Sequence, residues 1–150
     1  MLKRLSVMAL AMAIVLSTAS AAMSQEAATP IHPKVQEMVA KAKAAVTKVD
    51  AQAVKAAIDT KEKALFLDVR DPQEYAAGHL PGAIGISRGT LEFAVFGKIP
   101  DQAKKIYVYC KTGGRAALAT KTLNDLGYKN AVLADMVFAE WVNTGNPVEK

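Results

Sequence analysis

The chain has 150 residues, a formal net charge of +5 and an apolar share of 51%. This length suits one domain with short appendages. The single cysteine, Cys110, excludes a disulfide within the chain. The charge is mild and no dense basic stripe is interleaved with aromatic residues, so the composition does not favour a nucleic-acid partner.

The first 22 residues have the layout of a secretory signal peptide. Lys3 and Arg4 precede an apolar stretch over residues 5–16, and small residues follow up to Ala22. The apolar stretch is shorter than the roughly 20 residues that a membrane span needs. We therefore expect cleavage near Ala22, a periplasmic or secreted protein, and membrane contact only through this segment before cleavage. The alternative is an uncleaved anchor helix.

Residues 23–45 are predicted to form a flexible start followed by an amphipathic helix. Val35, Met38, Val39 and Ala42 recur at helical spacing, and Pro33 suits a first helical turn. We expect this helix to pack on the surface of the main domain. The alternative is a helix that binds a partner protein.

Residues 46–150 alternate between short apolar strands and helices. A short edge strand at 47–50 and a helix capped by Asp50 come first. The later strands are expected near residues 64–70, 82–86, 105–109 and 130–135, and the later helices near 71–77, 115–126 and 137–144, with one possible helical turn at 91–96. This alternation predicts an open α/β fold with a mostly parallel sheet and helices on both faces.

Cys110 stands at the carboxyl end of a predicted strand, where ligands bind in α/β sheets. The next residues are Lys111 and Thr112, then the pair Gly113 and Gly114, and Arg115 opens a helix. Paired glycines allow successive N–H groups to turn inward as an anion-binding nest, and a helix start adds positive potential. The pattern C-x-x-G-G-R therefore favours a nucleophilic thiolate held in an anion cradle. The alternative is a buried, inert cysteine.

Two long stretches of the sequence resemble a rhodanese-like domain of the single-domain thiosulfate sulfurtransferase family. The first is "FLDVRDPQEYAAGHLPGAIGI" and the second is "YVYCKTGGRAALATKTLNDLGYKNAVL", and the similarity covers roughly residues 46–149. The resemblance implies that Cys110 takes the sulfane sulfur of a small anionic donor, thiosulfate or a persulfide, and passes it to a thiol or to cyanide. It implies no metal and no organic cofactor.

Two other functions are alternatives for this sequence. A non-catalytic sulfur carrier or protein-binding module of the same fold would hold a persulfide on Cys110 for a protein acceptor. A phosphatase or arsenate reductase is disfavoured, because relatives with those activities carry a longer loop than the four residues between Cys110 and Arg115.

The predicted site extends beyond Cys110. The substrate-binding residues are expected to be Lys111, Thr112, Gly113, Gly114, Arg115 and Arg70, with Asp68 and Arg88 in support. The alternative role for Arg70 is an ion pair with Asp68 or Glu74. The alternative for Arg88 is a solvated charge on the surface. The chain also departs from the family pattern, because Met136 and Val137 stand where a glycine pair often precedes the last helix.

Overall fold

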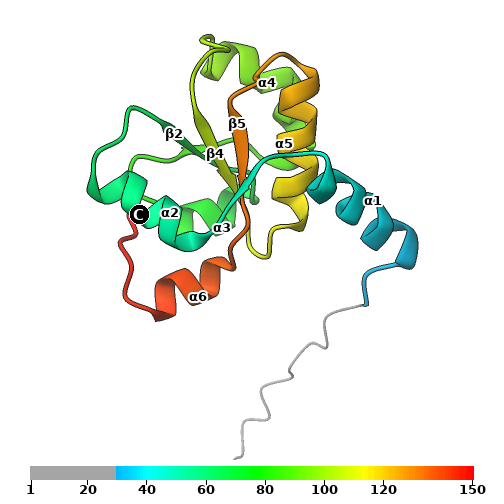
Figure 1. Cartoon of the computed structure of the whole chain (residues 1–150). Helices are drawn as coiled ribbons and strands as arrows, with labels where there is room; N and C mark the ends of the chain where they lie inside the picture. Colours follow the sequence, from blue (N-terminus) through cyan, green and yellow to red (C-terminus); the bar gives the residue numbers. More distant parts are fainter. Residues whose placement is uncertain (1–29) are drawn as a thin grey trace, which may run out of the picture. The chain divides into compact units, whose positions relative to one another are not determined.

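The computed structural model describes residues 30–150, and in residues 31–150 a single five-stranded sheet organises the chain (Figure 1). Every strand pair is parallel, and the strand order is β1-β5-β4-β2-β3. The strands are β1 (Lys48–Val49), β2 (Leu65–Asp68), β3 (Ile84–Gly85), β4 (Ile106–Tyr109) and β5 (Ala131–Ala134). The predicted α/β fold is confirmed, including β1 as an edge strand.

Helices cover both faces of this sheet, as expected. Buried residues of α1, α4 and α5 form a cluster on one face, and residues of α2, α3 and α6 pack on the other. The helices are α1 (Pro33–Ala44), α2 (Ala51–Asp59), α3 (Pro72–Ala77), the 3-10 turn η1 (Arg88–Thr90), α4 (Leu91–Lys98), α5 (Gly114–Asp125) and α6 (Phe138–Asn143). The predicted turn at 91–96 is in fact the eight-residue helix α4.

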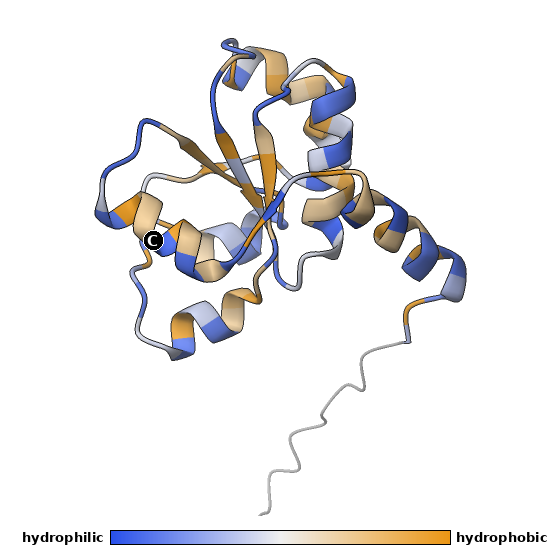
Figure 2. Ribbon diagram, in the orientation of Figure 1, coloured by the Kyte–Doolittle hydropathy of each residue, from blue (hydrophilic) through white to orange (hydrophobic). Residues whose placement is uncertain are grey.

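The central strand β4 is apolar throughout because both of its faces are covered. Ile106 and Val108 point into one core cluster, while Tyr107 and Tyr109 point into the other. Figure 2 shows the same pattern as hydrophobic strands between amphipathic helices. Cys110 follows directly and lies on the side of Val108.

Local signals fix where the first helices begin. The carboxylate of Asp50 accepts a hydrogen bond from the N–H of Ala53 at the start of α2. The side chain of Glu74 accepts one from the N–H of Asp71 at the start of α3. Pro33 occupies the first turn of α1, and His32, predicted as part of the flexible start, caps that helix by accepting from Lys34.

The N-terminal predictions fall largely outside the described residues. The signal peptide and the start of the flexible segment lie within residues 1–29. Within residues 30–150, no helix has the length and apolar character that crossing a membrane requires.

Candidate active site

Cys110 directly follows the central strand β4, which lies between β5 and β2 in the sheet. Only 1% of the residue is exposed. Its Sγ accepts hydrogen bonds from the backbone N–H of Gly113 at 3.2 Å and of Ala116 at 3.3 Å. Hydrogen bonds of this kind stabilise a negatively charged acceptor more than a neutral one. The geometry therefore matches the predicted anion cradle around the sulfur.

The two glycines of the loop differ in function. Gly113 has a φ of +87°, a left-handed conformation that strains residues with a side chain. A Cβ at this position would also lie 2.9 Å from Oδ1 of Asp135. Gly114 is instead the first residue of α5, so the helix begins one residue before the predicted Arg115. Only Gly113 needs the conformational freedom that the sequence suggested for both.

Arg115 is held by two carboxylates on the start of α3. Its guanidinium donates to Glu74 at 2.7 and 3.1 Å and to Asp71 at 3.3 Å. The hydrogen bond from Arg115 lowers the pKa of Glu74, against a smaller opposing effect of burial. The positive charge predicted for the cradle is thus largely balanced, and Arg115 fixes the loop to α3.

Arg70 adopts the ion-pair alternative rather than a free position for substrate. It donates to both oxygens of Asp68, at 2.6 Å for the shortest contact, and to the carbonyl of Gly78. Its guanidinium also stacks 3.9 Å from the ring centre of Phe138. Both charged residues are buried, so this pair joins the end of β2 to the start of α6.

Arg88 lies between η1 and α5. It donates to Glu92 at 2.9 and 3.2 Å and to the hydroxyl of Thr122 at 3.2 Å, and its buried Nε has no partner among residues 30–150. None of these contacts involves the Cys110 loop. The observed contacts thus differ from both expectations, a supporting residue of the substrate site and a solvated surface charge.

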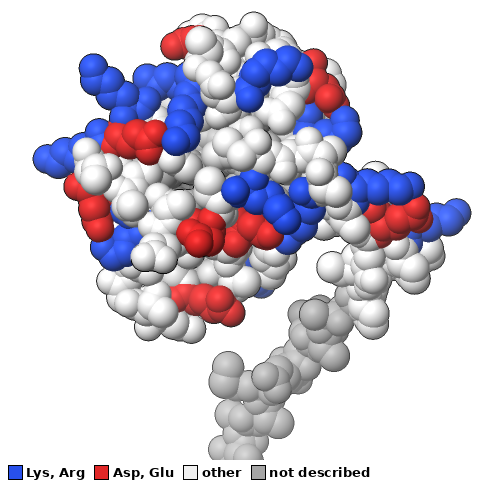
Figure 3. Space-filling model, viewed as in Figure 1, with Lys and Arg blue, Asp and Glu red and all other residues white. Residues whose placement is uncertain are grey.

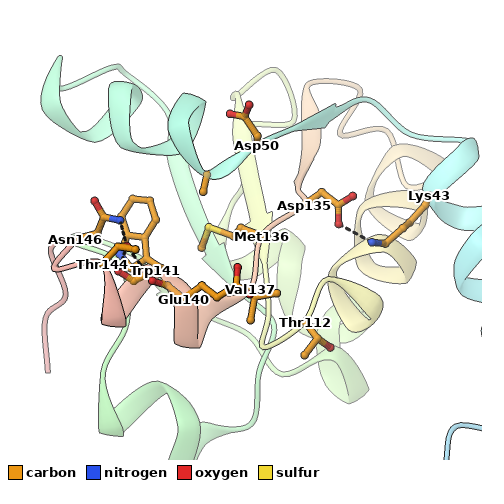
Figure 4. A pocket seen from close by; sticks show the side chains of 11 residues that line it. Lys43, Asp50, Thr112, Asp135, Met136, Val137, Glu140, Trp141, Thr144 and Asn146 are labelled. Carbon is orange, nitrogen blue, oxygen red and sulfur yellow. Dashed lines mark hydrogen bonds and ion pairs between the residues drawn. The ribbon is translucent and has the colours of Figure 1, made fainter.

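Two pockets flank the exposed residue Thr112. One, of about 510 Å³, lies towards α6 and is lined by Met136, Val137 and Trp141 among others (Figure 4). The other, of about 480 Å³, lies between α1 and α5. Lys111 is exposed beside them, and its carbonyl accepts from the N–H of Phe138.

Met136 and Val137, which replace the glycine pair of the family pattern, lie beside the Cys110 loop in the lining of one pocket. Met136 is buried in the core cluster of α6, and both residues line the 510 Å³ pocket. Their side chains therefore give this pocket an apolar wall where glycine would leave it open.

An ion pair that sequence reasoning missed lies beside the loop, and its Lys43 lines both pockets. Nζ of Lys43, on α1, lies 2.5 Å from Oδ1 of Asp135, which follows β5 (Figure 4). Both atoms are within 3.3 Å of the Cβ that Gly113 lacks. Figure 3 shows acidic and basic side chains interspersed on one face of the molecule, rather than a single basic patch. No signal in the sequence joins residues 92 positions apart.

The sequence is similar to those of known proteins. Residues 50–144 match the model of the Rhodanese-like domain family. The thiosulfate:glutathione sulfurtransferase of Saccharomyces cerevisiae is 33% identical over 92 residues, which are 54% of this chain and 66% of that protein. The putative sulfur carrier protein YrkF of Bacillus subtilis is 27% identical over 96 residues, 64% of this chain and 51% of that protein.

A solved structure is also similar to this chain. The polysulfide-sulfur transferase homodimer of Wolinella succinogenes superimposes with a TM-score of 0.66 at 29% identity, covering 77% of this chain and 87% of that one. The chain spans between about half and two thirds of the two curated relatives. The family match covers more than half of the chain and contains the Cys110 loop, so the chain belongs to the rhodanese-like domain family.

Proposed function

We propose that this protein is an exported sulfurtransferase that moves a sulfane sulfur from thiosulfate or a persulfide to a thiophilic acceptor. The observation that carries the proposal is the pair of N–H groups, from Gly113 and Ala116, that donate to the sulfur of Cys110. The sulfurtransferase relatives support the reaction class. The N-terminal sequence supports export.

The reaction proceeds in two displacements. The thiolate of Cys110 attacks the outer sulfur of thiosulfate, the S–S bond of the donor breaks, and sulfite leaves with the bonding electron pair. Cys110 then carries a persulfide. The acceptor, a thiolate or cyanide, attacks the outer sulfur of that persulfide, and the electron pair of the broken bond returns to Sγ.

The N–H donors serve every stage of this cycle. The thiolate, the departing sulfite and the persulfide are all anionic, and backbone donors hold such charge without reorganising. Residues around the loop keep these donors in place, because Arg115 ties it to Glu74 and Asp71. The same cradle would serve a thiol acceptor in the cell and cyanide in an assay.

A variant of Cys110 gives the first test. The protein should form thiocyanate and sulfite from thiosulfate and cyanide, and Cys110→Ser should lose all turnover while keeping its far-ultraviolet circular dichroism spectrum. Normal turnover by the folded serine variant would disprove the nucleophile. Hydrolysis of an aryl phosphate by Cys110 would instead favour the phosphatase alternative.

A second function is favoured by one observation, the near-complete burial of Cys110. A sulfur carrier would protect its persulfide from solvent and release it only to a docked protein, and the similarity to a putative sulfur carrier agrees. Such a protein would gain one sulfur atom from thiosulfate, as seen by intact mass, but would show almost no steady-state turnover with cyanide.

A further inference from the structure

Lys43 brings the end of α1 to the Cys110 loop. Its neighbour Ala42 is buried in the core cluster, which holds this end of α1 against α5. Nζ of Lys43 lies 2.5 Å from Oδ1 of Asp135 (Figure 4) and 3.3 Å from the position that a Cβ of Gly113 would take. Lys43 precedes residue 50, where the family match begins, so this contact is made by a helix outside the matched residues.

The carboxylate of Asp135 lies against the glycine that holds the sulfur. The N–H of Gly113 donates to Sγ of Cys110 at 3.2 Å, and Oδ1 of Asp135 is 2.9 Å from the position of the missing Cβ. These contacts place the carboxylate within roughly 9 Å of the sulfur. Salt does not fully screen charges at such a distance. An unpaired carboxylate there would oppose the negative charge that the cradle holds.

Lys43 supplies the countercharge of this carboxylate. Among residues 30–150, it is the one side chain that donates a hydrogen bond to Asp135. The N–H of Asp135 donates to the carbonyl of Val49, which fixes the backbone beside β1 but leaves the charge of the side chain unbalanced. Both side chains of the pair are about one-third exposed, so water can reach them. The charge balance at Gly113 therefore depends on Lys43.

The charged groups that other elements bring towards the loop form pairs of their own, apart from the exposed Lys111. These pairs are Arg115 of α5 with Glu74 and Asp71 of α3, Arg70 with Asp68 at the end of β2, and Arg88 of η1 with Glu92 of α4. The tyrosine in the same core cluster as Cys110, Tyr128, donates its hydroxyl to the carbonyl of Ile99. Because none of these groups contacts Asp135, none of them replaces Lys43.

We propose that Lys43 is a positioning residue for sulfur transfer, whose ammonium neutralises the Asp135 carboxylate beside Gly113 so that the cradle can hold negative charge on Cys110. The inference rests on the nucleophile of the proposed function. It adds a residue that acts on the sulfur through Asp135 and not by contact. The thiolate, the persulfide and the departing sulfite are all anionic, so the same charge balance serves each stage of the transfer.

The test measures the rate at which iodoacetamide alkylates Cys110 across a range of pH. Lys43→Met removes the charge and keeps much of the length of the side chain. We expect the midpoint of its rate profile to move up by about half a unit to one unit of pH, as follows for a unit charge at roughly 9 Å with a dielectric between those of a protein surface and bulk water. Below the midpoint, alkylation should then be about three- to tenfold slower.

Variants of opposite charge separate electrostatics from packing. Asp135→Asn removes the carboxylate and leaves Lys43 unpaired, so its midpoint should move down by a similar amount. The double variant, Lys43→Met with Asp135→Asn, should return close to the unchanged protein, and Lys43→Arg, which keeps the charge, should match it. Lys41→Met is the matched control. Lys41 also lies in the last turn of α1, but it is 76% exposed and pairs with Glu37, so its loss should leave the midpoint in place.

Three results would overturn the inference. An unchanged midpoint in Lys43→Met would show that its charge does not reach the sulfur. An upward shift in Asp135→Asn as well would show that the pair supports the loop only by packing, and this sign is informative even if Lys43→Met does not fold. An equal shift in Lys41→Met would assign the effect to the general charge of α1. Failure of the unchanged protein to transfer sulfur to cyanide would instead refute the proposed function, while the alkylation profiles would still test the charge balance.

Discussion

Replacing Gly113 with alanine should damage the sulfur cradle, whereas the same change at Gly114 should not. Gly113 has a φ of +87°, and its missing Cβ would lie 2.9 Å from the Asp135 carboxylate. Gly114 is helical, and its nearest neighbour would be a methyl group of Val39 at an ordinary 3.8 Å. The two variants therefore make the same chemical change in adjacent residues with opposite structural consequences.

The expected magnitude follows from these contacts. A left-handed alanine costs about 1–2 kcal/mol, so urea unfolding should show a stability loss of at least this size for Gly113→Ala. Movement of the loop would also weaken the N–H donation to Sγ. A hydrogen bond to a charged group is worth about 1.5–3 kcal/mol, which corresponds to a loss of about 10- to 100-fold in transfer rate.

Two assays follow the effect. Thiocyanate formation from thiosulfate and cyanide reports transfer, and alkylation of Cys110 by iodoacetamide at neutral pH reports the reactivity of the sulfur. Both should fall in Gly113→Ala, and Gly114→Ala should stay close to the unchanged protein in both. Equal behaviour of the two variants would refute the cradle geometry, since it would mean that the position of the Gly113 N–H does not matter.

Two further predictions concern the ion pairs that surround the loop. Asp68→Asn should lower the free energy of unfolding, measured in urea, by about 3–5 kcal/mol, because it leaves the buried Arg70 guanidinium without its countercharge. A loss below about 1 kcal/mol would show that the pair is not buried in solution. Arg115 holds the pKa of Glu74 below its usual 4.5, so this pair stabilises the fold fully above that pH and loses its effect as the pH falls through the lower folded-state pKa. Glu74→Gln should therefore lower the free energy of unfolding by under about 1 kcal/mol at pH 7, and the variant should lose less stability than the unchanged protein as the pH falls below 4.5. Thermal unfolding across pH measures both effects. An acid profile equal to that of the unchanged protein would contradict this assignment.

The sequence predicted the fold and the hydrogen-bonded loop around Cys110 well because both depend on local signals. Each buried strand is a short apolar run, and Asp50 and Glu74 mark helix starts through contacts within three residues. The contacts of the Cys110 loop are also local, because the N–H groups that donate to the sulfur belong to Gly113 and Ala116, three and six residues further along the chain.

The contacts that the sequence did not predict join residues that are far apart in the chain. Lys43 meets Asp135 only because α1 packs on α5, and Arg115 meets Glu74 only because β4 and β2 are neighbours. The C-terminal residues likewise return to the loop before β3, where Glu149 bridges to His79. Periodicity and capping signals identify elements, but the partner of a charged side chain depends on how the elements pack.

The account depends most on the ability of Cys110 to take up and release a single sulfur atom. Intact-mass measurement of the protein after thiosulfate treatment, and again after added cyanide, tests this directly. We predict a gain equal to one sulfur atom that cyanide removes as thiocyanate, and no gain in Cys110→Ser. An unchanged mass after thiosulfate and after a small persulfide donor, or a gain that persists in the serine variant, would contradict the account.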